Sequence, residues 1–198
     1  MIYLLPVIAK VAERMVLVEI TKHVELKDTQ FVSRPNRGVH NAMTVVYEFL
    51  EGDKNYCTAI LSMDVERGLY CIDIDLMVDF LMARGCPRSL ILTVMHWASN
   101  RKARFRFNRL VSKEFHLSKD IPQGSPLSPF LFRVYVADIF RPRLKYTPVV
   151  RSFVSSYGDD SLIAVAGDSM AMVRGQLEEV YEDSSCVVQG RSMKFSDL

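Results

Sequence analysis

The stretch VVRSFVSSYGDDSLIAVAG, residues 149–167, places two adjacent acids between two apolar runs. The runs Val149–Val154 and Leu162–Val165 predict strands, and Tyr157–Asp160 between them predicts a tight turn. Solvated aspartates are common in such turns, so an ordinary acidic turn is one interpretation. The other is a site for a hard cation, because Mg²⁺ takes oxygen ligands and is typically held by one or two carboxylates.

A second apolar run supplies a further carboxylate. Residues 56–65, YCTAILSMDV, predict a buried strand that presents Asp64 at its end. If this strand lies beside the hairpin, Asp64 comes near Asp159 and Asp160, because paired strands are only about 4.8 Å apart. The carboxylates could then share two metal ions about 3.5–4 Å apart, which would clamp the attacking and leaving oxygens of a phosphoryl displacement.

The third feature is the loop IPQGSPLSP, residues 121–129. Its composition alone is that of a linker, but the signals of a helix follow it directly. Ser128 is expected to cap that helix and Pro129 to occupy its first position, with the helix continuing until Pro142. Gly124 would permit close backbone approach to a flat ligand or base.

Taken in chain order, these features resemble the reverse transcriptase domain of non-LTR retrotransposons. The octapeptide PQGSPLSP at residues 122–129 is the most specific match. Weaker similarity covers essentially residues 1–198, including two fingers motifs, a hairpin and a later palm strand at 4–14, 30–37, 101–108 and 190–196. Viral RNA-dependent RNA polymerases share the Gly-Asp-Asp turn but carry a different pattern before the corresponding helix. Group II intron and retron enzymes are the related alternatives.

The resemblance implies an α+β fold, a right-hand polymerase palm with partial fingers. It assigns the N-terminal part of the fingers to residues 1–56, the first palm strand to 57–75, helices and a basic fingers hairpin to 76–119, and the palm with octapeptide and acidic hairpin to 120–198. Both ends of the chain are abrupt, so we expect the palm to be truncated and the thumb to be absent. We therefore expect a fragment with little or no activity on its own.

The resemblance also implies an activity. Deoxynucleotides, supplied as deoxynucleoside triphosphates, would be added to the 3′-hydroxyl of a DNA primer on an RNA template. Asp64, Asp159 and Asp160 are implied as catalytic ligands of two Mg²⁺ ions, for which Mn²⁺ can substitute, and the Val65 carbonyl would complete the metal shell. The implied nucleotide- and template-binding residues are Leu69, Gln123, Gly124, Ser125, Arg104 and Arg106.

The sequence departs from the family after the first aspartate. The family usually has Ala-Phe-Asp at the fourth to sixth following positions, whereas this chain has Gly68-Leu69-Tyr70. The family aromatic is the expected steric gate against the ribose 2′-hydroxyl, so Leu69 is expected to loosen sugar discrimination. Tyr70 replaces a carboxylate that is not expected to bind metal.

A noncatalytic nucleic-acid-binding or scaffold remnant of the same fold is the alternative. Residues 101–109 hold five cations interleaved with Phe105 and Phe107, and cations contact phosphates while aromatic rings stack on bases. The alternation over residues 102–108 more often marks a half-buried strand, with the phenylalanines inward and the arginines in water.

Composition limits the remaining classes. With 49% hydrophobic and 24% charged residues the chain can bury a core, which excludes disorder. The net charge is only +2, so affinity for nucleic acid must come from local clusters. Four cysteines in no CxxC pattern indicate neither a zinc site nor a disulfide framework, so an intracellular compartment is expected, nuclear or cytoplasmic.

The N-terminal segment predicts an amphipathic helix. An apolar stripe at spacings of three and four is expected to pack on the core: Leu4, Leu5, Ile8, Val11, Ala12 and Met15. The charged residues Lys10, Glu13 and Arg14 are expected to face away. They also argue against a bilayer span, which needs about 20 nearly uncharged residues, so no membrane partner is expected.

Overall fold

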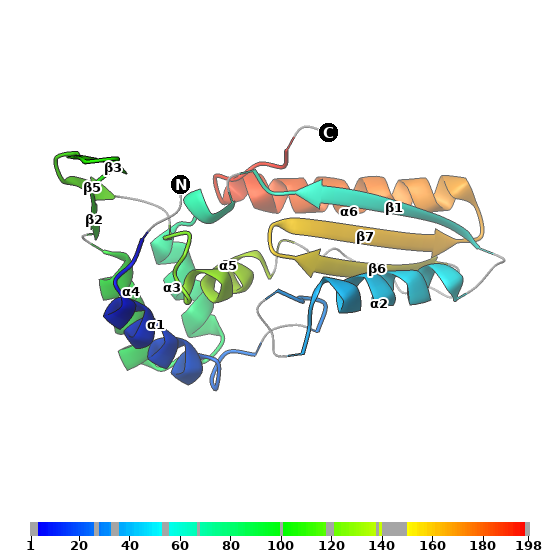
Figure 1. The fold of residues 1–198 in the computed structure, drawn as a ribbon. Helices are drawn as coiled ribbons and strands as arrows, with labels where there is room; N and C mark the ends of the chain where they lie inside the picture. Colours follow the sequence, from blue (N-terminus) through cyan, green and yellow to red (C-terminus); the bar gives the residue numbers. More distant parts are fainter. Residues whose placement is uncertain are drawn as a thin grey trace. The chain divides into compact units, whose positions relative to one another are not determined.

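In the part of the chain that the structure describes, helices combine with one three-stranded sheet and two short ladders (Figure 1). The computed structural model describes residues 4–25, 28–32, 36–52, 56–66, 68–99, 101–117, 121–137, 139 and 150–196. In chain order the elements are α1 (Val7–Ile20), α2 (Val39–Glu51), β1 (Cys57–Asp64), the 3₁₀ turn η1 (Gly68–Tyr70), α3 (Ile74–Ala83), α4 (Arg88–Ala98), β2 (Arg101–Ala103), β3 (Arg106–Phe107), β4 (Leu110–Val111), β5 (Phe115–Leu117), α5 (Ser128–Val136), β6 (Val150–Tyr157), β7 (Asp160–Gly167) and α6 (Met170–Gly190). The expected mixture of helices and strands is confirmed.

Two compact units share the chain, and each is built from two separate segments. The helical unit contains Met1–Glu25 and Leu69–Val134, and the sheet unit contains Leu26–Gly68 and Tyr135–Leu198. The division into fingers and palm segments remains a prediction, because these units have other boundaries.

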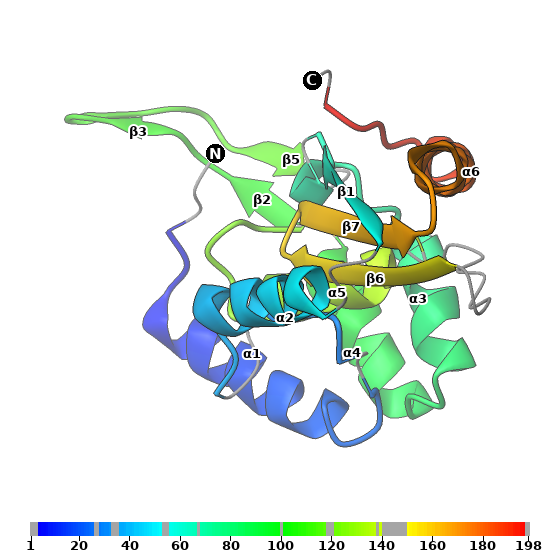
Figure 2. The same cartoon turned by 90° about the vertical axis from the view of Figure 1, so that its right-hand side faces the viewer.

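The sheet unit is built on an antiparallel sheet in the strand order β1-β7-β6. The central strand β7 is buried on both faces, and Ile163, Ala164 and Val165 are each 0% exposed. Helix α6 contacts β7 and β1, while α2 contacts β6 and β7 on the opposite face (Figure 2). The ring of Phe49 in α2 stacks on Phe153 in β6. This packing holds β7, which begins at Asp160, from both sides.

Strand β1 forms where the sequence predicts it, but it is an edge strand and only partly buried. Met63 is 4% exposed, whereas Ile60 on the other face is 44% exposed. The cause is that α6 covers one face of β1, while the contacts of α2 are mainly with β6 and β7. An apolar run cannot distinguish an edge strand with one covered face from a fully buried strand.

The helical unit packs α3 against α4 and α4 against α1. Helix α5 is almost completely buried, with Phe130, Leu131 and Val134 at most 1% exposed. The described helix ends at Val136, and the predicted end at Pro142 lies outside the described residues. In the described part of the chain no helix has both the length and the apolar character needed to cross a membrane.

Helix α1 also forms as predicted, but the prediction of its buried face is wrong. Ile8, Val11 and Met15 are 80%, 51% and 69% exposed, whereas Glu13 is 6% exposed. Glu13 is buried because two donors in the same unit meet its carboxylate, the Trp97 indole and the Ser125 hydroxyl. Helical periodicity separates apolar from polar positions, but it does not show which charge has buried partners far along the chain.

The basic segment forms two short ladders, β2 with β5 and β3 with β4, instead of one strand over 102–108. Phe105 and Phe107 are 56% and 75% exposed, so the expectation that the phenylalanines point inward is wrong. Phe105 stacks on Phe115 of the neighbouring strand, with ring centroids 4.9 Å apart. A two-stranded hairpin has no second layer against which both rings could be buried.

Candidate active site

The β6–β7 hairpin places the adjacent aspartates at one end of the sheet. Tyr157 pairs with Asp160 in the ladder, and Gly158 and Asp159 form the turn between them. Gly158 has a φ of +75°, a left-handed conformation that residues with a side chain rarely adopt. This glycine therefore permits the two-residue turn that connects the strands at the acidic end.

Asp64 lies beside these two acids. Strands β1 and β7 are paired so that Asp64 is directly opposite Asp160, a position in which Cβ atoms are about 4.5–5.5 Å apart. The backbone N–H of Val65, a residue only 2% exposed, donates to the Asp159 carbonyl at 3.4 Å. The structure thus brings together the three acids, which the sequence supplies from two distant segments. We call this end of the sheet the acidic corner.

The carboxylates of the acidic corner repel one another. Burial raises the pKa of Asp160 above its ordinary value of 3.8, and the negative charges of Asp159 and Asp64 raise it further. Because the pKa is raised in the folded state, ionised Asp160 reduces stability above that pKa, and this cost disappears as the pH falls below 3.8. A cation bound among the carboxylates would offset the repulsion.

The segment Met193–Ser196 runs beside the end of β1. Phe195 forms an antiparallel bridge with Val65. The Ser196 backbone N–H donates to the Asp64 carbonyl at 2.9 Å, and its hydroxyl donates to Asp64 Oδ2 at 2.8 Å. Ser196 is therefore a site residue that the sequence analysis missed, because no motif connects it to Asp64.

The Val65 carbonyl, the predicted backbone ligand, does not take part in this bridge. The bridge consists of two hydrogen bonds: the one from the Ser196 N–H to the Asp64 carbonyl, and one from the Glu66 N–H to the Lys194 carbonyl at 2.9 Å. Lys194 Nζ also lies 2.6 Å from Glu66 Oε2. This ion pair joins the two residues next to the bridged pair, Glu66 after Val65 and Lys194 before Phe195, so a lysine lies close to the acidic corner.

The donor atoms at the acidic corner are oxygens, the ligands that Mg²⁺ and Mn²⁺ prefer. Within the described residues, no three or more His, Cys, Asp or Glu side chains are arranged so that they could hold a metal ion. The fit to Mg²⁺ therefore rests on the chemistry of the carboxylates and on their mutual repulsion, not on a preformed cage of ligands.

In the helical unit, two residues implied for nucleotide binding lie on segments that are hydrogen-bonded to each other. The Leu69 carbonyl accepts the Ile121 N–H at 3.1 Å. The Tyr70 hydroxyl donates to Gln123 Oε1 at 3.0 Å. The structure thus brings the Leu69 and Gln123 segments together. It also adds Tyr70 to the residues of this region, and because Tyr70 and Gln123 are 53 residues apart, no local sequence pattern could indicate their contact.

The loop itself is shaped by Gly124 and Ser125. Gly124 has a φ of +107°, which favours glycine, and Ser125 is 4% exposed. The Ser125 hydroxyl oxygen accepts the backbone N–H groups of Leu127 and Ser128 at 3.0 and 3.3 Å. The expectation that Ser128 caps α5 is wrong. The Ser128 hydroxyl donates to the Pro122 carbonyl at 2.8 Å, and it is the Ser125 hydroxyl that accepts backbone N–H groups at the start of the helix.

Arg104 and Arg106 lie on the basic hairpin of the helical unit and differ in their partners. Arg104 and Lys102 lie 3.2 and 3.0 Å from Glu114. The hydrogen bond and charge of Lys102, followed by those of Arg104, lower the pKa of Glu114. Arg106 donates to the Asn108 carbonyl at 3.4 Å, and no acidic side chain among the described residues pairs with it.

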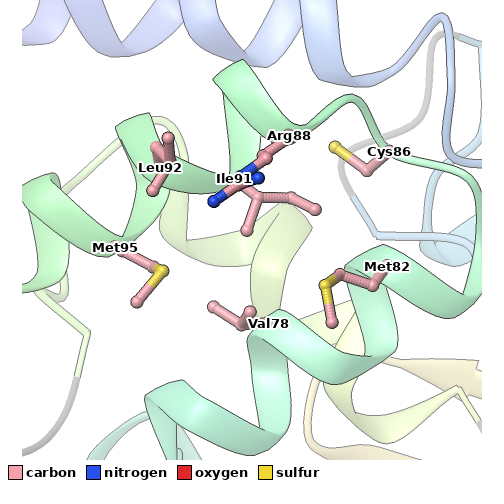
Figure 3. A pocket seen from close by; sticks show the side chains of 7 residues that line it. All are labelled: Val78, Met82, Cys86, Arg88, Ile91, Leu92 and Met95. Carbon is pink, nitrogen blue, oxygen red and sulfur yellow. The ribbon is translucent and has the colours of Figure 1, made fainter.

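A cavity of about 550 Å³ between α3 and α4 has a different character (Figure 3). Among the described residues that line it, Arg88 is the one with a charge, and the others are Val78, Met82, Cys86, Ile91, Leu92 and Met95. Burial raises the pKa of the Cys86 thiol, which disfavours the reactive thiolate. The lining therefore offers no carboxylate or activated nucleophile comparable with the acidic corner.

Comparison with known proteins shows the family to which the chain belongs. The family described as "Reverse transcriptase (RNA-dependent DNA polymerase)" matches residues 1–188, and the chain belongs to this family. A curated relative, the "Probable RNA-directed DNA polymerase from transposon X-element" of Drosophila melanogaster, is 26% identical over 99% of this chain and 21% of the relative. These matches confirm the resemblance to a non-LTR retrotransposon reverse transcriptase domain. The chain spans about a fifth of the length of that relative.

A solved structure supports the fold independently. The apo telomerase from Candida tropicalis, truncated from its C-terminal domain, superposes with a TM-score of 0.61 and 11% identity, over 95% of this chain and 38% of the telomerase chain. At this identity the likeness concerns the fold alone. It is consistent with the palm and fingers arrangement of reverse transcriptases.

Proposed function

We propose that this chain is the catalytic region of an RNA-directed DNA polymerase from a non-LTR retrotransposon. The observation that carries the proposal is the direct pairing of Asp64 with Asp160, next to Asp159, in a chain of the reverse transcriptase family. The substrates would be an RNA template with a DNA primer and deoxynucleoside triphosphates. The reaction would be attack of the primer 3′-hydroxyl on the α-phosphate of the triphosphate, which adds the nucleotide and releases pyrophosphate.

In this proposal Asp64, Asp159 and Asp160 hold two Mg²⁺ ions, or Mn²⁺ in their place, and the Val65 carbonyl adds a ligand. When bound, the ions would neutralise charge on the triphosphate and favour attack by the primer hydroxyl. The chain itself fixes the carboxylates: the β1–β7 ladder aligns two of them, and the Ser196 hydroxyl restricts the rotation of Asp64. Such fixed positions matter because phosphoryl transfer depends chiefly on positioning and electrostatics.

We assign the palm to residues 57–75 and 120–198, and the fingers to residues 1–56 and 76–119. The palm segments supply all three strands of the central sheet and its acidic corner, which supports this assignment. The nucleotide pocket would be formed by Leu69, Gln123, Gly124 and Ser125. Because Leu69 is aliphatic where the family has an aromatic gate, we expect weaker discrimination against ribonucleotides.

Extension of oligo(dT) on poly(rA) with dTTP and Mg²⁺ tests the proposed activity. Two proteins should be compared: this chain, and the chain lengthened with flanking polymerase sequence of the fly relative, which would add grip on the duplex. Mg²⁺-dependent incorporation by the longer protein would support the proposal, and incorporation by that protein alone would show that the short chain lacks substrate grip. No incorporation by either protein, although both fold and bind the duplex, would contradict it.

The basic hairpin favours a second candidate function, binding of single-stranded nucleic acid without catalysis. Phe107 and Leu110 are 75% and 76% exposed beside Arg106 and Arg109, so apolar and cationic groups lie together at the hairpin end. Such a surface suits stacking on bases and contact with phosphates. Salt-sensitive binding without any metal-dependent extension would favour this function over the polymerase.

Removing the charges of Arg106 and Arg109 is expected to weaken RNA binding. The logarithm of the binding constant falls with the logarithm of the salt concentration, and each phosphate contact to a single strand contributes about 0.7 to the steepness of this fall. The variant with Arg106→Gln and Arg109→Gln should therefore show a slope that is shallower by about 1.4. Fluorescence anisotropy with a labelled RNA over a salt series measures this. The matched control is Arg174→Gln, which changes an exposed arginine paired with Glu178 on α6. An unchanged slope in the double variant would count against the hairpin as a binding surface.

A further inference from the structure

Glu13 lies in the stretch 4–14 that resembles a fingers motif, but the resemblance implies no role for its buried carboxylate, and the acidic corner does not include it. It is 6% exposed, and both of its hydrogen-bond donors are neutral. Trp97 Nε1 donates to Oε1 at 2.8 Å, and Ser125 Oγ donates to Oε2 at 2.5 Å. Burying a charged group is costly unless its hydrogen bonds are made, so this arrangement constrains both donors.

The bond to Glu13 decides what the Ser125 hydroxyl can do. A hydroxyl has one hydrogen and two lone pairs, and here the hydrogen points to Glu13. The oxygen is then free to accept the N–H groups of Leu127 and Ser128, which lie 3.0 and 3.3 Å away at the start of α5. Without the carboxylate, the hydroxyl could rotate and donate elsewhere.

These bonds hold the loop on both sides of Gln123 and Gly124. The Pro122 carbonyl accepts the Ser125 N–H at 3.1 Å and the Ser128 hydroxyl at 2.8 Å. The two residues between Pro122 and Ser125 are therefore confined to a tight turn, in which Gly124 has a φ of +107°. A change in how Ser125 is held would alter the turn that presents Gln123.

We propose that Glu13 is a positioning residue, which acts through Ser125 to fix the conformation of the octapeptide loop and the presentation of Gln123 to the incoming nucleotide. The step from loop conformation to nucleotide binding rests on the proposed polymerase function. The step from Glu13 to loop conformation does not, and it can be measured without activity. The sharpest test changes the carboxylate and keeps its size.

Glu13→Gln is that change. A carboxylate accepts one donor at each of its two oxygens, whereas glutamine has an NH₂ donor in place of one oxygen, so it cannot accept from both Trp97 and Ser125 in the same way. We prefer it to alanine because a cavity of about 220 Å³ already adjoins Glu13 and would be enlarged. Hydrogen exchange at the Leu127 and Ser128 amides should accelerate by about tenfold, which corresponds to the low end of the stabilisation that a hydrogen bond to a charged group contributes. Trp97 is the single tryptophan, so its fluorescence reports the other bond directly.

In an active polymerase, Glu13→Gln should raise KM for the deoxynucleotide by about tenfold, the cost of one lost hydrogen bond to a charged group, and change kcat less. Glu19→Gln is the matched control: it makes the same substitution on α1 at a side chain that is 47% exposed, and it should change neither exchange nor fluorescence. In a Ser125→Ala background, Glu13→Gln should have little further effect on exchange, because the two act in one chain of bonds.

Unchanged exchange at Leu127 and Ser128 in folded Glu13→Gln protein would overturn the inference. Additive effects of the Glu13 and Ser125 changes would do the same. Faster exchange with an unaltered KM in an active polymerase would overturn the positioning role. Inactivity of the lengthened wild-type protein, folded and bound to the duplex, would count against the proposed function alone, because exchange and fluorescence report the loop without catalysis.

Discussion

Replacing Asp64 or Asp159 by asparagine is expected to reduce primer extension by more than about a hundredfold. Asparagine keeps the size of the side chain and removes the negative charge that would hold a cation. Loss of a group that merely supports a metal ligand typically costs about 10–100-fold, so loss of the ligand itself should cost more. Single-turnover extension with Mg²⁺, using the lengthened protein, measures the effect.

Asp168→Asn provides the matched control, since Asp168 is an exposed residue just past the opposite end of β7. It should extend primers at the wild-type rate. Hydrogen exchange in β7 should be alike in all variants, so that a loss of rate reflects chemistry rather than unfolding. Near-normal extension by Asp159→Asn would remove the acidic corner from the mechanism.

Replacing Ile163 by alanine is expected to destabilise the fold by about 2–5 kcal/mol, the usual range for removing a large aliphatic side chain from a core. Ile163 is 0% exposed and lies in the central strand, whose neighbours are β1 and β6. Three strands and the acidic corner therefore depend on its packing. Urea denaturation followed by circular dichroism gives the free energy of unfolding.

Ile60→Ala makes the same chemical change on the edge strand, where the side chain is 44% exposed. Because the Ile60 side chain buries much less apolar surface on folding, the loss in the free energy of unfolding should be below about 1 kcal/mol. A clear difference between the two variants would reflect the central position of β7. Equal losses would contradict the strand order.

The acidic corner was predictable from sequence because each of its signals is local. One strand-like run ends at Asp64, and another begins after Asp160. The acids at these two strand ends lie close together only if the two strands are paired. The family resemblance implied that Asp64 lies near Asp159 and Asp160, and the pairing of Asp64 with Asp160 in the structure agrees with this. The contribution of Ser196 was not predictable, since a serine near a chain end carries no signal of its partner.

The supporting contacts of the loop were not predictable for a related reason. Glu13 and Ser125 are 112 residues apart, and a glutamate on a helix is normally assigned to the solvated face. Only the folded arrangement shows that a tryptophan and a serine donate to it. Likewise, alternation in the basic segment suggested a single strand over residues 102–108, but it could not show that two short ladders form or that no second layer covers Phe107.

Because each compact unit is made from two distant stretches, this protein is a poor subject for deletion mapping. Any cut of the gene after codon 25, 68 or 134 would separate at least one unit from its own other half. The truncated products would expose core surfaces and report misfolding rather than lost function. Single-residue exchanges, together with tags or fusions confined to the termini, are therefore the appropriate genetic tools.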